Sequence, residues 1–120
     1  MMTEKPELNS DAVLENIIKE LGSGVFFIII TSENGAVIKS YINEEFNKNS
    51  IGLNMAQLYE LAEEIASDVG IHNPDFTVIH SDNFYIISVK ILAKIVVLLT
   101  EDQISFEKIF EIINNSITSN

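Results

Sequence analysis

The feature that most constrains this fold is an unbroken apolar run over residues 25–30, which is followed at once by a turn and a second apolar segment. The run is rich in β-branched and aromatic residues, so it predicts a strand that is buried on both faces. Asn34 and Gly35 tolerate the positive φ angles of a tight hairpin turn, and residues 36–42 are expected to return as the second strand.

Neither face of the first strand suits exposure to water. Successive side chains of a strand point to opposite faces, and every side chain in this run is apolar. Helices are therefore expected to cover the sheet on both sides. We expect one face to carry Phe26, Ile28 and Ile30, and the other to carry Val25, Phe27 and Ile29.

Composition narrows the classes of function. The chain has 120 residues, enough for one domain with its own core. It contains no cysteine, which excludes disulfides, zinc–thiolate sites and cysteine catalysis. The formal net charge is -11, from 18 acidic and 7 basic residues, so a basic partner surface suits the chain better than nucleic acid or anionic lipid. All of the basic residues are lysines, so no arginine is available to a phosphate.

The ends of the chain carry no strong structural signal. Residues 1–9 are polar and contain Pro6, which predicts a flexible tail, and residues 118–120 are expected to fray. The N-terminus lacks the layout of a signal peptide, and no apolar run approaches the ~20 residues of a membrane span. We therefore expect a cytoplasmic protein without membrane insertion, with a single domain over residues 10–117.

Two helices are predicted around the hairpin. The first covers residues 10–21, with Ser10 as N-cap and Gly22 as stop, and its apolar stripe suits one face of the sheet. Residues 43–50 are expected to form a polar connection. The second helix is predicted over residues 54–69, because Asn54 and Gln57 have capping-box spacing and Gly70 marks an end.

The second helix carries a wide apolar arc. The arc covers about 160° of the helical wheel, against about 100° for an ordinary surface helix, so one sheet is not expected to cover it. Glu60, Glu64 and Asp68 follow at i+4 spacing on the remaining face, where their repulsion requires water or a basic partner. A single broad core face beside a solvated acidic face is the alternative interpretation. The arc consists of Met55, Leu58, Tyr59, Leu61, Ala62, Ile65, Ala66 and Val69.

The C-terminal half predicts three strands and a last helix. The strands cover residues 76–80, 84–90 and 94–100; the first is short and mixed, as an edge strand would be, and the last is expected beside residues 25–30. The turn at residues 91–93 contains no glycine, which leaves the length of that hairpin open. Thr100 and Gln103 have capping-box spacing and are expected to open the third helix. Its predicted buried stripe is Phe106, Ile109, Phe110, Ile113 and Ile117.

This order of elements, over almost the whole chain, resembles the roadblock/dynein light chain family. The segment GVFFIIITSENGAVIKS is similar to the family's first hairpin, and MAQLYELAEEIASDVG is similar to its second helix. The resemblance implies an α+β fold with a five-stranded antiparallel sheet, with the first and third helices on one face and the second on the other. Family members are scaffolds or regulators of small Ras-like GTPases, or adaptors in motor and signalling complexes.

The resemblance also implies where partners bind. Family members commonly dimerise by pairing their third strands edge to edge and packing their second helices together. A small Ras-like GTPase would have to be activated through its own switch residues, because the chain has no arginine finger. A homodimer, or a dimer with a related roadblock subunit, is expected through Leu58, Leu61, Ala62, Ile65, Phe76, Thr77, Val78 and Ile79. The GTPase is expected against Tyr59, Glu60, Glu64 and Asp68.

Catalytic and metal chemistry has little support in the sequence. His72 and His80 are eight residues apart with no cysteine to assist, so we expect neither a metal site nor another cofactor. The segment Gly22-Ser23-Gly24 is too short for a phosphate-binding loop, and no Gly-x-Ser-x-Gly elbow occurs. We therefore expect a protein that is not an enzyme.

Two other interpretations remain open. A monomeric profilin- or longin-like interaction module has a similar mixture of helices and strands, and it predicts no pairing of strand edges. A small-molecule sensor would need a pocket, of which the densely apolar strands give no sign.

Overall fold

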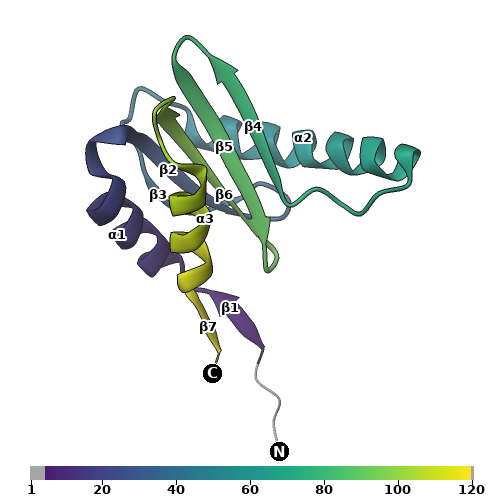
Figure 1. The fold of residues 1–120 in the computed structure, drawn as a ribbon, viewed down its shortest axis with the longest axis horizontal. Helices are drawn as coiled ribbons and strands as arrows, with labels where there is room; N and C mark the ends of the chain where they lie inside the picture. The colour runs from purple at the N-terminus through teal and green to yellow at the C-terminus, as the bar shows by residue number, and fades with distance from the viewer. Residues whose placement is uncertain (1–4, 120) are drawn as a thin grey trace, which may run out of the picture.

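The computed structural model describes residues 5–119, which form a central sheet, three α-helices and a short two-stranded ribbon (Figure 1). In chain order the elements are β1 (Pro6–Leu8), α1 (Ser10–Leu21), the 3₁₀ turn η1 (Gly22–Gly24), β2 (Val25–Ser32), β3 (Val37–Tyr41), α2 (Lys48–Val69), β4 (Phe76–Ser81), β5 (Phe84–Ile91), β6 (Lys94–Glu101), α3 (Phe106–Asn115) and β7 (Ile117–Ser119).

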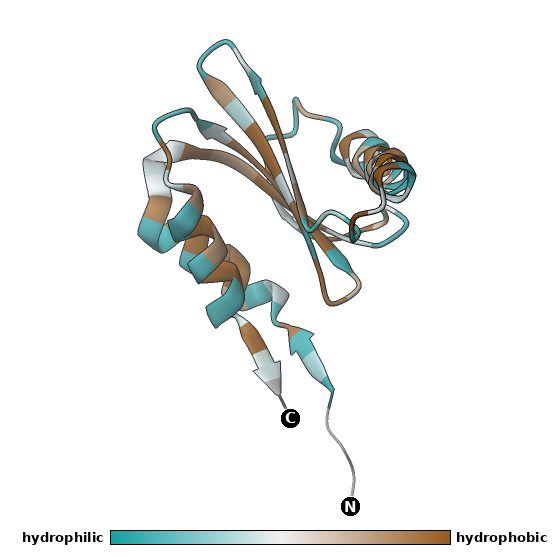
Figure 2. Ribbon diagram, turned by 45° about the vertical axis from the view of Figure 1, so that its right-hand side comes forward, coloured by the Kyte–Doolittle hydropathy of each residue, from teal (hydrophilic) through white to brown (hydrophobic). Residues whose placement is uncertain are grey.

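Five strands form one antiparallel sheet in the order β3-β2-β6-β5-β4. Helices α1 and α3 lie together on one face, here the α1/α3 face, and α2 crosses the opposite face, here the α2 face (Figures 1 and 2). This architecture confirms the predicted α+β fold. The predicted neighbours are confirmed too, because β6 lies beside β2 and β4 lies at an edge.

The sheet separates two apolar cores, and β2 contributes to both of them. Phe27 to Ile30 are at most 3% exposed, so this strand is buried on both faces, as predicted. The core on the α1/α3 face includes Val13, Ile17, Ile28, Ile30, Ile87, Val96, Leu98, Ile109 and Ile113. The core on the α2 face includes Phe27, Ile29, Met55, Ala56, Tyr59, Ile95 and Val97.

The start of β2 departs from strict alternation. The pairing of β2 with β6 shifts register between Val25 and Phe27. Val25 consequently lies in the α1/α3 core, whereas Phe26 is 44% exposed and packs edge-on against Phe84, with ring centroids 5.5 Å apart. The predicted faces of Val25 and Phe26 are therefore wrong. The physical reason is a bulge, since one extra residue moves every preceding side chain to the other face.

Helix α2 begins at Lys48, not at residue 54 as predicted. Its N-cap is Asn47, whose side-chain oxygen accepts a hydrogen bond from the Ser50 N–H at 3.1 Å. Gly52 lies inside the helix, where it touches the β2–β3 turn. A Cβ atom on Gly52 would stand 2.6 Å from the backbone oxygen of Gly35, so this close approach requires glycine rather than marking a helix end.

Helix α3 also begins elsewhere than predicted. Thr100 and Glu101 are the last residues of β6, and Thr100 pairs with Val25, so sheet pairing overrides the expected capping box. The N-cap is Ser105, whose hydroxyl accepts from the Lys108 N–H at 3.2 Å. Within the predicted stripe, Ile109 and Ile113 are buried, Phe106 and Phe110 are partly buried, and Ile117 lies beyond the helix in β7.

Residues near the two chain ends form a short ribbon that the sequence did not predict. Strands β1 and β7 pair with each other, and Leu8, opposite Ile117, is only 2% exposed. Lys94 donates from Nζ to the Leu8 carbonyl at 3.0 Å. The sequence predicted a flexible tail and a frayed C-terminus here, whereas in the structure residues 6–8 and 117–119 form this two-stranded ribbon. Residues 1–4 and 120 lie outside the described residues.

Both C-terminal hairpins close through two residues with positive φ. Asp82 and Asn83 have φ values of 54° and 70°, which these short polar residues tolerate. Leu92 and Ala93 have φ values of 49° and 64°, although this region costs an ordinary residue about 1–2 kcal/mol. The β5–β6 hairpin, whose length the sequence did not determine, therefore closes with a strained two-residue turn.

Candidate protein-interaction surface

Helix α2 extends past the edge of the sheet. Its first half crosses the α2 face, and its last turns project beyond β4 (Figure 1). Met55 and Tyr59, in the part above the sheet, are 5% and 1% exposed. Leu61, Ile65 and Val69, in the projecting part, are 57%, 65% and 66% exposed. The wide apolar arc is therefore divided between the core and an uncovered surface, as the single-sheet argument predicted.

Part of the α2 face of the sheet is also uncovered, near the β4–β5 turn. Ile79, Phe84 and Phe26 are 43%, 39% and 44% exposed there. Beside them the sheet is hollowed, with a volume of about 230 Å³ between the ends of β4, β5 and β6. The sequence did not single out Phe26 and Phe84 as surface residues, since only the bulge at the start of β2 turns Phe26 outward.

Strand β4 pairs with β5 on one side only, and within residues 5–119 no strand pairs with its other side. Thr77 and Ile79 point to the α2 face. Phe76 points to the α1/α3 face, where it packs on Phe110 with ring centroids 5.0 Å apart, and Val78 is 36% exposed. The predicted edge residues thus lie on both faces of one strand. Leu58 and Ala62 of α2 are partly buried.

A buried polar cluster connects α2 to β4 and β5. The Tyr59 hydroxyl donates to the Ser88 carbonyl at 2.9 Å. The Ser88 hydroxyl lies 2.5 Å from that of Thr77 and donates to the Met55 sulfur at 3.1 Å. Burial raises the pKa of Tyr59 above its usual value, an effect that the hydrogen bonds from its neighbours partly offset. The cluster fixes the helix over the edge of the sheet.

This cluster corrects one predicted site residue. Tyr59 was expected to contact a GTPase, but its side chain is buried and its hydroxyl is used inside the domain. The reason is that Tyr59 lies on the side of α2 that faces β5, where its hydroxyl reaches the Ser88 carbonyl. In this structure Tyr59 thus belongs to the core beneath α2 and not to the exposed surface around it.

The acidic residues of α2 occupy two different environments. Glu60, Glu64 and Asp68 are exposed and make no ion pair within residues 5–119. Glu63 instead faces the sheet, and its carboxylate lies 3.1 Å from Nζ of Lys90. The three exposed residues therefore form an outward acidic face, as predicted, whereas the sequence did not separate Glu63 from them.

The described residues offer no cluster of metal-binding side chains beside this surface. Among residues 5–119 no group of three or more His, Cys, Asp and Glu side chains could hold a metal ion. Nε2 of His80 lies 3.4 Å from Oδ2 of Asp102, and His72 is exposed in the loop before β4. None of the helices in the described part is long and apolar enough to cross a membrane. The surface consists of apolar and acidic groups, which suits contact with another protein.

No protein-family model and no curated protein sequence matches the chain. In structure it is similar to MglB of Myxococcus xanthus, with a TM-score of 0.76 and 13% identity over 88% of this chain and 85% of that one. It is also similar to a roadblock/LC7 domain from Streptomyces avermitilis, with a TM-score of 0.73 and 11% identity over 89% of this chain and 90% of that one. For profilin IB of Acanthamoeba castellanii the TM-score is only 0.50, with 14% identity over 90% of this chain and 88% of that one. The chain therefore has the roadblock-type fold that its sequence resembles.

Proposed function

We propose that this chain is a homodimeric, non-catalytic roadblock-type scaffold or regulator that binds a small Ras-like GTPase in the cytoplasm. The observation that carries the proposal is the projecting end of α2. There three large apolar side chains, Leu61, Ile65 and Val69, are more than half exposed. Burying one such side chain contributes roughly 1.5–3 kcal/mol, so the end of the helix favours association.

A two-fold pairing through β4 accounts for both uncovered surfaces at once. Two copies whose β4 edges pair in antiparallel fashion make one continuous sheet, and a two-fold interface uses the same patch twice. The projecting end of each α2 then lies over the sheet of the other copy. There it meets the side of the α2 face on which Ile79 and Phe84 have no cover. The exposed helix and the exposed sheet thus complement each other.

The GTPase part of the proposal rests on the family resemblance and on charge. Glu60, Glu64 and Asp68 stay outward on α2 when its apolar side is covered, so they remain available to a basic surface. The chain contains no arginine. Any stimulation of GTP hydrolysis would therefore act by ordering residues of the GTPase itself.

Charge reversal at the three acidic positions tests this site. We expect the triple variant Glu60→Lys, Glu64→Lys, Asp68→Lys to bind purified Ras-like GTPases of the source organism at least tenfold more weakly. Three rim ion pairs of about 0.2–1 kcal/mol each are lost, and repulsion is added. Binding is measured by calorimetry with the GTPase loaded with GDP or with a GTP analogue.

A charge-matched control separates the site from net charge. The variant Glu7→Lys, Glu15→Lys, Glu33→Lys changes the charge equally at exposed positions on β1, α1 and the β2–β3 turn. It is expected to bind like the wild type. Equal weakening in both variants would mean that only net charge matters, and unchanged binding of the α2 variant would remove these residues from the interface.

A further inference from the structure

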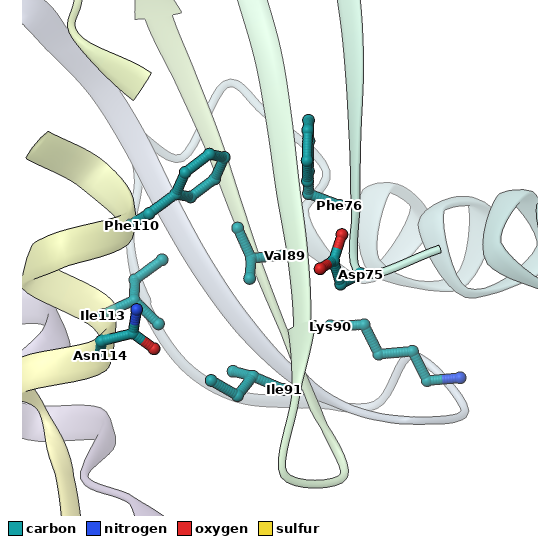
Figure 3. Close-up of a pocket in the computed structure, with 8 residues that line it drawn as sticks. All are labelled: Asp75, Phe76, Val89, Lys90, Ile91, Phe110, Ile113 and Asn114. Atoms are coloured by element: carbon teal, nitrogen blue, oxygen red, sulfur yellow. The ribbon is translucent and has the colours of Figure 1, made fainter. Parts of the chain in front are cut away.

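A second hollow lies on the α1/α3 face, opposite the α2 surface. Its volume is about 330 Å³, and it opens between the ends of β4 and β5 and the C-terminal half of α3 (Figure 3). The sheet separates it from the α2 surface, although one of its walls, Phe76, also belongs to the β4 edge that pairs in the dimer proposed above. The apolar walls are Phe76, Val89, Ile91, Phe110 and Ile113.

The walls suit one apolar side chain. Val89 and Ile113 are 9% and 1% exposed and form a firm base. The rings of Phe76 and Phe110 pack at a tilt along one side, with centroids 5.0 Å apart. Phe76 is 44% exposed, so the hollow is open to solvent on that side. Small-molecule sites bury roughly 70–90% of their ligand. An open hollow with a firm base favours the side chain of another protein chain.

The rim of the hollow is acidic. Asp75 stands at the mouth, fixed by a backbone hydrogen bond from the Lys90 N–H to its carbonyl at 2.9 Å, and its carboxylate makes no ion pair within residues 5–119. The Lys90 side chain points away from the hollow (Figure 3). Its Nζ lies 3.1 Å from the Glu63 carboxylate of α2, on the other face of the sheet.

Helix α3 contributes no free positive charge beside the hollow. Its lysine, Lys108, pairs with Glu20 of α1, with Nζ 3.1 Å from Oε1. Glu107 and Glu111 are exposed on the same helix. The negative charge at the mouth is therefore that of Asp75, and the net charge of -11 adds attraction for a basic chain.

We propose that this hollow is a docking site for a basic linear segment of a partner protein. A branched aliphatic side chain of the segment enters between Phe76 and Phe110, and a neighbouring lysine or arginine pairs with Asp75. The apolar base supplies affinity for the aliphatic group, and the acidic rim selects the charge beside it.

A peptide titration of the full chain tests the proposal. The probe is acetyl-Lys-Lys-Leu-Lys-Lys-amide, followed by two-dimensional NMR of the uniformly ¹⁵N-labelled protein. We expect saturable shifts at the residues that line the hollow. A peptide with alanine in place of leucine should bind at least about tenfold more weakly, since it loses most of the buried apolar group.

Two protein variants complete the test. Asp75→Asn should weaken peptide binding by about two- to fivefold, as expected for one partly exposed ion pair. Glu15→Gln, which likewise removes one carboxylate charge at an exposed position, on α1, should leave the affinity unchanged. Asn114→Trp, at the mouth of the hollow, should block binding without touching the buried base.

Three results would overturn the proposal. Equal affinity for the leucine and alanine peptides would mean attraction by net charge alone. No saturable shift up to millimolar peptide would mean that the hollow binds no such segment. Binding of N-acetyl-leucinamide as tightly as the peptide, unchanged in Asp75→Asn, would make the hollow a small-molecule site instead.

Discussion

Replacing Tyr59 by phenylalanine tests whether the buried cluster holds α2 on the sheet. Tyr59→Phe keeps the ring and its packing but removes the hydrogen bond of 2.9 Å to the Ser88 carbonyl. A net loss of about 1 kcal/mol in the free energy of unfolding is expected at pH 7. With a urea dependence of about 1–3 kcal/mol per M, the unfolding midpoint should fall by roughly 0.3–1 M.

The same variant predicts a pH dependence. Burial raises the pKa of Tyr59, so the folded state keeps its proton at a pH where the unfolded tyrosine, with a pKa of 10.0, has lost it. The contribution of Tyr59 to the free energy of unfolding is therefore fully present below pH 10. Above pH 10 it falls by at most about 1.4 kcal/mol per pH unit. Tyr59→Phe lacks this loss. The stability gap between wild type and variant should narrow as the pH rises above 10.

The assay is urea unfolding at fixed protein concentration, at pH 7 and at several values above pH 10. Tyr41→Phe is the matched control, because Tyr41 is 50% exposed on β3. It should change the midpoint by little at any pH. The reasoning would be refuted if Tyr59→Phe left the midpoint at pH 7 unchanged, or if the gap to the wild type stayed constant above pH 10.

Two further changes test the contacts that position the helix and the last hairpin. Gly52→Ala should lower stability by about 1–2 kcal/mol in urea unfolding, because overpacking against the Gly35 backbone exceeds the ~1 kcal/mol gain in helix propensity; a more stable variant would contradict the close approach. Ala93→Gly should raise the thermal midpoint by a few degrees, because relief of the positive φ of 64° exceeds the ~0.5–1 kcal/mol entropic cost of glycine. A lower midpoint would show that the turn is not strained.

Much of the fold could be predicted because its signals are local. The run at residues 25–30, the Asn34–Gly35 turn and the apolar period of α1 each lie within one element. The observed bounds of α1 are those predicted, although its N-cap is Asn9 and not Ser10. Strand β3 is one residue shorter than predicted at each end, and β4, β5 and β6 each extend one residue further at their C-terminal end. The order of elements then restricted the topology to few choices. An edge position for β4 followed from its short, mixed sequence.

The errors arose where tertiary contacts override local signals. Gly52 weakens a helix in isolation, but here it lets α2 approach the β2–β3 turn. Thr100 has the form of a helix cap, but it continues β6 because β2 is available to pair with it. The bulge before Phe27 depends on how β2 meets β6, which no pattern within β2 indicates.

The candidate surface could be predicted in outline only. Leu61 and Tyr59 both belong to the apolar arc, but they lie about 160° apart around the helix. Tyr59 therefore faces the sheet, whereas Leu61 does not. The exposure of the sheet near Phe84 depends on the path of α2 across the sheet, so the sequence alone did not predict it. The hollow beside Asp75 is likewise made by elements far apart in the chain.

The central claim is that the projecting end of α2 and the free edge of β4 join two copies of this chain. The most direct test is the solution mass by light scattering over a wide concentration range. For the wild type we predict about twice the chain mass of 13.4 kDa. The variant Leu61→Glu, Ile65→Glu should be a folded monomer, and Ile38→Glu, at a 50% exposed position on the opposite edge, should remain a dimer. A wild type that stays at 13.4 kDa at every concentration, or a double variant that stays dimeric, would contradict the account.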